Sequence, residues 1–139
     1  MKTKIVLAIV PRIQDDFGYT PAGTALVKGA IINAGFDCKI FDFNSDIDHR
    51  YQNNKELMVP IENWFMNYNF YSNKIFKIVE QLINDWADQI LEYNPTYVGI
   101  SIFSYNSQRA TRMLSTVLKS RNPNIKIFIG GAGLNTDDK

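Results

Sequence analysis

The chain has 139 residues, of which 45% are hydrophobic, and this is enough material for one hydrophobic core and a single domain, residues 1–139. The formal net charge is +1, so no overall charge imbalance favours nucleic acid or an anionic membrane as a partner. The single cysteine, Cys38, cannot form an internal disulfide, which indicates a reducing, cytoplasmic location. The apolar run Lys4–Val10 is too short for a signal-peptide core or a membrane span.

The first elements predicted along the chain are a strand and a helix. Ile5–Val10 is a short apolar run rich in β-branched residues and is closed by Pro11, a pattern typical of a strand buried on both faces. Thr20 has the residue type of a helix N-cap, and the residues after it predict a helix over Pro21–Ala34 that ends at Gly35. The expected inner face of this helix consists of Ala22, Leu26, Ala30 and Ile31.

The middle of the chain gives a second strand and a second long helix. Cys38–Phe43 alternates as a strand nearer the sheet edge. Residues 44–71 are predicted to be a long aromatic-rich connection with one helical turn near Ile61–Phe65. A clear helix follows and stops near Asn94-Pro95. Its apolar residues at helical spacing are Ile75, Val79, Leu82, Ile83, Trp86, Ile90 and Leu91.

The last third contains two further strands with a helix between them. Thr96–Ile102 and Ile125–Ile129 are apolar runs of strand length, and Asn106–Lys119 has helical periodicity with Asn122-Pro123 as its terminator. The expected inward residues of this helix are Ala110, Met113, Leu114, Val117 and Leu118.

Strands and helices that alternate in this way form a parallel sheet covered by helices on both faces. We expect a flavodoxin-like or Rossmann-like three-layer α/β sandwich with strand order 2-1-3-4, lacking a last strand. Ligands of such sheets lie outside the carboxyl ends of the strands, where the strand order reverses. The segments expected to meet there are residues 11–20, 103–107 and 130–133.

Two stretches carry a resemblance to a known family. The opening IVLAIVPRIQDDFGYTPAGTALVKGAIINAGFDCKIFDFN and the later YVGISIFSYNSQRATRMLSTVLKSRNPNIKIFIGGAG resemble the cobalamin-binding domain ahead of the catalytic domain in many B12-dependent radical S-adenosylmethionine proteins. The resemblance covers nearly the whole chain outside residues 44–94. It implies that the domain holds cobalamin with its cobalt toward a radical S-adenosylmethionine catalytic domain, in cis or in trans. That missing domain would carry the iron–sulfur cluster and S-adenosylmethionine.

The resemblance also implies a set of cofactor-binding residues. Hydroxyl groups at the end of the third strand would hydrogen-bond the corrin side chains or the nucleotide tail, and glycines after the fourth strand would let the ligand approach the backbone. The start of the first helix would offer N–H groups to amide or phosphate oxygens. The implied residues are Pro11, Thr20, Pro21, Gly23, Ser101, Phe103, Ser104, Gly130, Gly131, Ala132 and Gly133.

The chain also departs from related patterns. The Asp-Xaa-His-Xaa-Xaa-Gly signature that supplies a cobalt ligand in methionine-synthase-like domains is absent, and the corresponding loop reads QDDFG. The only histidine, His49, is expected to lie in a solvated loop. No cluster-binding triplet of cysteines, nucleophile with an adjacent base, or metal-ligand spacing is present, so no catalysis is expected from this chain alone.

Two alternatives remain, and both lack cobalamin. One is a cofactor-free interaction or scaffold module that kept the fold, and the other is a domain for a different nucleotide, which the lack of Gly-Xaa-Gly-Xaa-Xaa-Gly after the first strand disfavours. Basic residues such as Arg112 and Arg121 fit a solvated helix face better than nucleic-acid contact. Only LNTDDK follows the glycine turn, where a full domain of this kind continues with a fifth strand and a helix. We therefore expect an exposed fourth strand, or a homodimer formed through that sheet edge.

Overall fold

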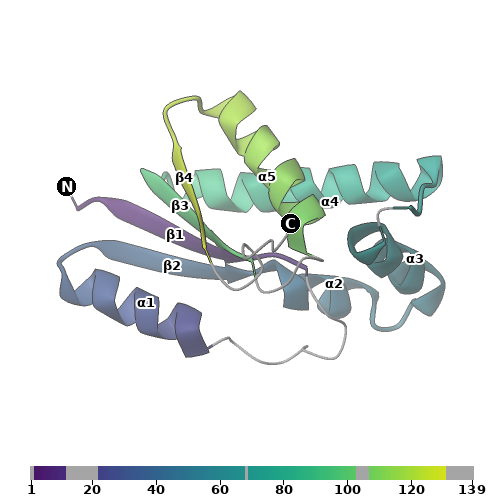
Figure 1. The fold of residues 1–139 in the computed structure, drawn as a ribbon, viewed down its shortest axis with the longest axis horizontal. Helices are drawn as coiled ribbons and strands as arrows, with labels where there is room; N and C mark the ends of the chain where they lie inside the picture. Colours follow the sequence, from purple (N-terminus) through teal and green to yellow (C-terminus); the bar gives the residue numbers. More distant parts are fainter. Residues whose placement is uncertain (1, 12–21, 68, 103–106, 131–139) are drawn as a thin grey trace, which may run out of the picture.

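The structure is a computed structural model that describes residues 2–11, 22–67, 69–102 and 107–130 (Figure 1). The elements in chain order are β1 (Lys4–Ile9), α1 (Ala22–Asn33), β2 (Asp37–Asp42), α2 (Phe43–Tyr51), α3 (Lys55–Met66), α4 (Asn73–Glu92), β3 (Tyr97–Ser101), α5 (Gln108–Arg121) and β4 (Lys126–Gly130). The strands form one parallel sheet in the order β2-β1-β3-β4. The predicted α/β fold, flavodoxin-like or Rossmann-like, and its strand order are confirmed.

The two faces of the sheet are set by the alternation of side chains along each strand. Val6 and Ala8 in β1, and Val98 and Ile100 in β3, belong to the main core cluster with residues of α4 and α5. The residues that alternate with these along the strands, such as Leu7 and Gly99, face the second side of the sheet. On this side α1 packs against β2. Figure 1 shows α1 on the opposite side of the sheet from α4 and α5. Helices therefore lie on both faces, as predicted, but α1 alone, among the described helices, faces the second side.

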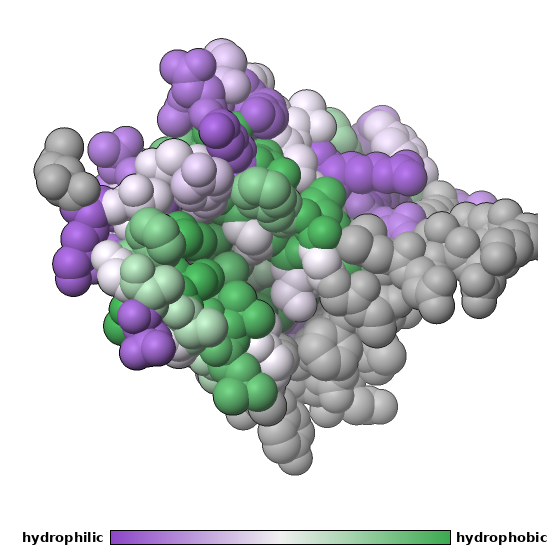
Figure 2. Space-filling view, turned by 60° about the vertical axis from the view of Figure 1, so that its left-hand side comes forward, coloured by the Kyte–Doolittle hydropathy of each residue, from purple (hydrophilic) through white to green (hydrophobic). Residues whose placement is uncertain are grey.

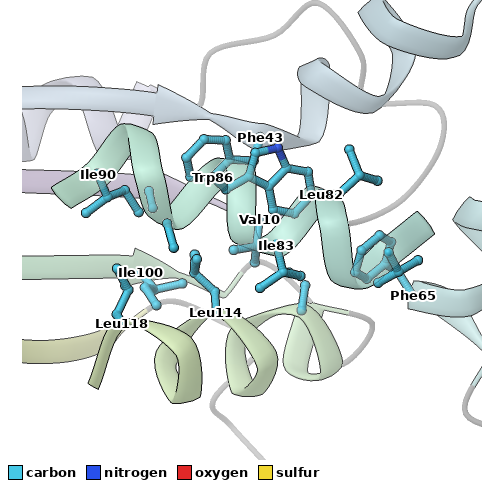
Figure 3. Close-up of a cluster of buried hydrophobic side chains, with 14 of the residues drawn as sticks. Val10, Phe43, Phe65, Leu82, Ile83, Trp86, Ile90, Ile100, Leu114 and Leu118 are labelled. Atoms are coloured by element: carbon cyan, nitrogen blue, oxygen red, sulfur yellow. The ribbon is translucent and has the colours of Figure 1, made fainter. Parts of the chain in front are cut away.

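The centre of the core is an aromatic group on the α4 side of the sheet (Figure 3). The Trp86 indole stacks on the Phe43 ring at a centroid distance of 4.9 Å and on the Phe65 ring at 6.1 Å. These contacts join α2, α3 and α4 around one fully buried side chain. The seven buried residues of α4 follow helical spacing, and all but Ala87 were predicted: Ile75, Val79, Leu82, Ile83, Trp86, Ala87 and Ile90.

The prediction of a long connection over residues 44–71 is wrong, because α2 and α3 occupy most of this segment. Asp42 starts α2 by accepting hydrogen bonds from the Ser45 backbone N–H (3.1 Å) and hydroxyl (2.9 Å). In α3, Met58, Ile61 and Phe65 are buried at helical spacing even though Pro60 lies inside the helix.

The predicted inner face of α1 is also wrong in part. The Leu26 side chain is 75% exposed and Ala30 is exposed, whereas Thr24 is buried and Lys28 and Ile31 are half-buried. Apolar residues occur on all sides of this helix, so its composition does not select one face. The packing of α1 beside β2 determines which face of the helix is buried. The helix ends as predicted, since Gly35 has the positive φ of 97° that favours glycine at this position.

The other element bounds lie within two residues of those predicted. Within α5, Met113 and Val117 are partly buried, while Ala110, Leu114 and Leu118 are fully buried. Among the described strands, β4 has a neighbour on one side only, as predicted for the fourth strand. No helix in the described part of the chain is long and apolar enough to cross a membrane.

Candidate functional site

A cavity of about 510 Å³ lies between α1 and the second face of the sheet, and it extends to the carboxyl ends of β3 and β4. Its lining comes from four elements that are far apart in the sequence. The described lining residues are Leu7, Gly23, Thr24, Val27, Gly99, Ile100, Ser101, Phe128, Ile129 and Gly130. They include two hydroxyl groups and no ionisable side chain, so this part of the cavity is suited to binding an apolar group rather than to acid–base catalysis.

The floor of the cavity depends on a glycine in β3. A Cβ atom at Gly99 would lie 3.0 Å from the Leu7 Cδ2 atom, so the absence of a side chain lets Leu7 of β1 lie against β3. Ser101 follows two residues later and faces the same side of the sheet, because side chains alternate along a strand. The hydroxyl of Ser101 therefore lies at the carboxyl end of a floor that is otherwise apolar.

The wall opposite β4 is the first part of α1. A Cβ atom at Gly23 would meet no atom of the described residues within 4 Å, so this glycine leaves open space in the described lining. Thr24 is 8% exposed, and Val27, one turn further along, is 50% exposed. On the β4 side, a Cβ atom at Gly130 would likewise meet none of the described atoms within 4 Å. Gly23 in the α1 wall and Gly130 in the β4 wall, both predicted site residues, thus leave gaps on opposite sides of the cavity.

The structure brings together some of the predicted site residues and leaves others outside its described part. Gly23, Ser101 and Gly130 line the same cavity. Pro11 is buried directly beyond the end of β1. Seven predicted residues lie outside the described residues: Thr20, Pro21, Phe103, Ser104, Gly131, Ala132 and Gly133.

The floor and wall residues Leu7, Thr24, Val27, Gly99 and Phe128 were missed by the sequence analysis. Strand alternation offers a signal for two of them, since Gly99 precedes Ser101 by two residues and Phe128 precedes Gly130 by two. The contribution of Thr24 and Val27 depends on the orientation of α1, which the sequence does not fix.

The cavity continues into a second apolar groove toward the amino ends of the strands. This groove has a volume of about 430 Å³ and shares Leu7, Gly99 and Phe128 with the cavity. Phe36 and Phe128, which are 41% and 60% exposed, line it. Figure 2 shows hydrophobic residues gathered on one face, with hydrophilic residues above them and to their left. The second face of the sheet is thus apolar well beyond the predicted ligand edge.

Buried polar groups lie near the carboxyl ends of the strands but outside the described lining. Ser107 precedes α5, is 1% exposed, and its Oγ atom makes no hydrogen bond within the described structure. Asn44 of α2 and Glu62 of α3 are also buried. Sequence analysis placed Ser107 in the segment 103–107 at the expected ligand edge. It did not single out Asn44 or Glu62, because it did not predict α2 and α3, to which they belong.

Titratable groups of the described residues provide no metal centre. No group of three or more His, Cys, Asp and Glu side chains that could hold a metal ion occurs in residues 2–11, 22–67, 69–102 and 107–130. His49 is exposed in the last turn of α2 rather than in a loop. Burial raises the pKa of the Cys38 thiol, an effect that nearby Lys28 partly offsets, so this thiol is not an activated nucleophile.

Comparison with protein-family models, with curated proteins and with solved structures finds no match to this chain. Its fold is therefore established by the arrangement of its own strands and helices.

Proposed function

We propose that the chain is the cobalamin-binding domain of a radical S-adenosylmethionine protein and positions the corrin for a catalytic domain outside this chain. The observation that carries the proposal is the cavity of about 510 Å³, which collects Gly23, Ser101 and Gly130 from three separate elements. These three residues belong to the set of cofactor-binding residues that the family resemblance implies. Ligands of open α/β sheets lie at this end of the strands.

The residues present fit part of cobalamin. The apolar floor, with gaps at Gly23 and Gly130, suits the flat base of the nucleotide tail. The volume is too small for the whole corrin, which would lie outside the strand ends, with Ser101 available to hydrogen-bond a polar side chain of the ligand. Bound cobalamin would supply the cobalt chemistry, and this chain would supply position and exclusion of water.

A cofactor-free interaction module is the second candidate. The observation that favours it is the apolar surface on α1, where Leu26, Val27 and Ile32 are 75%, 50% and 51% exposed. Under this alternative, the cavity and the adjoining groove would hold a partner's side chains. The two candidates differ in whether a small molecule binds without any other protein.

A binding experiment with a matched pair of variants separates the candidates. Purified chain is mixed with hydroxocobalamin, desalted and examined by its visible spectrum, and a dissociation constant is obtained by titration. Gly23→Leu places a side chain in the gap of the cavity wall, while Gly29→Leu makes the same change in α1 away from the lining. Leucine has the higher helix propensity, so neither variant is expected to lose α1.

We expect the wild-type chain and Gly29→Leu to retain cobalamin with equal affinity and Gly23→Leu to bind at least about tenfold more weakly. A parallel titration with cobinamide, which lacks the nucleotide tail, should be insensitive to Gly23→Leu. A colourless wild-type protein after desalting would overturn the proposal and favour the cofactor-free module. Equal binding by both variants would exclude this cavity as the site of the tail.

A further inference from the structure

The edge of β4 that faces no other described strand, called its free edge below, carries fewer charged residues than the opposite edge of the sheet. Edge strands commonly carry charged residues that prevent association with another strand. β2 has three charged residues among its six, Asp37, Lys39 and Asp42. β4 has one, Lys126, at its first position. The remaining residues of β4 include Phe128 and Ile129, which are 60% and 41% exposed.

The hydrogen bonds between β3 and β4 determine which backbone groups face the free edge. The Lys126 N–H donates to the Thr96 carbonyl at 3.1 Å, and the Gly130 carbonyl accepts from the Ile102 N–H at 2.8 Å. In a parallel pair, every second residue directs both its N–H and its C=O to the same neighbour. Lys126, Phe128 and Gly130 therefore face β3, whereas Ile127 and Ile129 direct both groups to the free edge.

We propose that β4 pairs with β4 of a second copy of this chain, antiparallel and in a register centred on Phe128. In this register Ile127 lies opposite Ile129 of the second copy, so residues with outward-facing backbone groups meet and exchange hydrogen bonds. Each strand contributes two N–H donors and two carbonyl acceptors, which gives four bonds across the two-fold axis. No other register centred within β4 pairs all of these outward groups with one another.

Side-chain chemistry agrees with the same register. Lys126 lies opposite Gly130 of the second copy, so no like charges meet. On the α5 side of the sheet, the Ile127 side chain of each copy lies beside the Ile129 side chain of the other. On the open side, the two Phe128 rings meet in a non-hydrogen-bonded pair, where opposing side chains are closest. Exposed apolar side chains would thus be buried on both sides of the sheet, and the two sheets would join into one.

The first test measures molar mass over a concentration series by sedimentation equilibrium without added cobalamin. The wild-type chain should approach twice its mass of 15.9 kDa as the concentration rises. Ile129→Pro removes an outward N–H but no bond to β3, a position that tolerates proline in an edge strand. It should weaken association by roughly tenfold or more. A wild-type chain that stays monomeric throughout, or a dimer unaffected by Ile129→Pro, would overturn the proposal.

A charge-swap experiment tests the register. Phe128→Lys and Phe128→Glu each place like charges opposite one another across the two-fold axis, so each variant alone should be monomeric, and an equimolar mixture should dimerise. Circular dichroism of each variant checks that the fold is kept. Failure of the mixture to associate, with both variants folded, contradicts a register centred on Phe128.

Disulfide cross-linking tests the register with variants that are not designed to weaken dimer association. In a Cys38→Ser background, Phe128→Cys places the two thiols in the non-hydrogen-bonded pair, where Cα atoms are about 4.5 Å apart, within disulfide range. Lys126→Cys is the matched control on the same strand, since its counterpart in the second copy is Gly130. Oxidation should cross-link Phe128→Cys rapidly and Lys126→Cys slowly. Equal rates would overturn the register.

Discussion

Removal of the Asp46 carboxylate should destabilise the fold by removing one of the contacts between α2 and α4. The Trp86 indole N–H donates to Asp46 Oδ2 at 2.7 Å, and the Trp86 side chain is fully buried. The same oxygen accepts from Arg50 Nε at 2.8 Å. In Asp46→Ala, the indole N–H would remain buried without this acceptor.

The expected loss follows from the burial of each partner. A buried donor that loses its partner costs about 1–3 kcal/mol, and the half-exposed ion pair with Arg50 adds less than about 1 kcal/mol. We expect Asp46→Ala to lower the free energy of unfolding by about 2–3 kcal/mol. At roughly 4 °C per kcal/mol for a domain of this size, the melting temperature should fall by about 8–12 °C.

Urea unfolding followed by tryptophan fluorescence measures this loss. Asp48→Ala, in the same helix, removes the same charge without touching Trp86, and should change stability by less than about 0.5 kcal/mol. Asp46→Asn keeps an oxygen acceptor and should recover at least half of the loss. Arg50→Ala removes the ion pairs of Arg50 with Asp46 and Asp85 but leaves the hydrogen bond between Trp86 and Asp46 in place. The reasoning is refuted if Asp46→Ala and Asp48→Ala unfold at the same urea concentration.

Three further predictions concern other parts of the molecule. In urea unfolding, Leu26→Gln should change the free energy of unfolding by less than about 0.5 kcal/mol, because the Leu26 side chain is 75% exposed. Leu114→Ala should reduce it by about 2–5 kcal/mol, because Leu114 is fully buried. Arg109→Ala should cost about 1–3 kcal/mol in the same assay, because its guanidinium lies 3.7 Å from the Trp64 ring centroid and donates to the Trp64 carbonyl at 2.6 Å. The hydrogen bond from Gln81, with a contribution from Arg50, lowers the pKa of Asp85. The ionised Asp85 carboxylate therefore stabilises the folded state at neutral pH, and this contribution is lost as the pH falls below about 4. Asp85→Asn should therefore be slightly less stable than wild type at pH 7, and the difference should vanish in acid-unfolding curves.

The strands and the long helix could be predicted because each has one dominant period. The strands are short apolar runs between turn residues, and the buried residues of α4 repeat with helical spacing. The strand order 2-1-3-4 was predicted because flavodoxin-like sheets, whose crossover connections are right-handed, have it. These features depend on local pattern and chirality, and tertiary contacts did not change them.

Residues 44–71 could not be interpreted in the same way because their local signals conflict. Pro60 indicates a break, while Met58, Ile61 and Phe65 repeat with helical spacing. The repeat prevails because Ile61 and Phe65 belong to the core cluster that contains Trp86, a contact between segments far apart in the sequence. The same dependence on tertiary contact hid the buried polar residues of α2 and α3.

The candidate site was predictable at the strand ends and not along its floor. The rule for open α/β sheets placed the segment that begins at Gly130 at the ligand edge, and the family resemblance implied Gly23 and Ser101. The depth of the cavity depends on how α1 lies against β2 and on how much of the second face it leaves uncovered. Those facts come from packing between elements, and α1, apolar on all sides, gives no sequence signal for them.

The two proposals use different atoms of β4, and this makes them separable. The cavity uses the Phe128 side chain and the gap at Gly130, which face the second side of the sheet. The dimer uses the outward backbone groups of Ile127 and Ile129. Gly23→Leu should therefore weaken cobalamin binding without changing molar mass, and Ile129→Pro should do the reverse. Phe128→Lys should affect both, because this ring lines the cavity and lies at the two-fold axis. If Ile129→Pro abolished cobalamin binding as well, the cavity would be complete only in the dimer, and the phenylalanine of the second copy would belong to its wall.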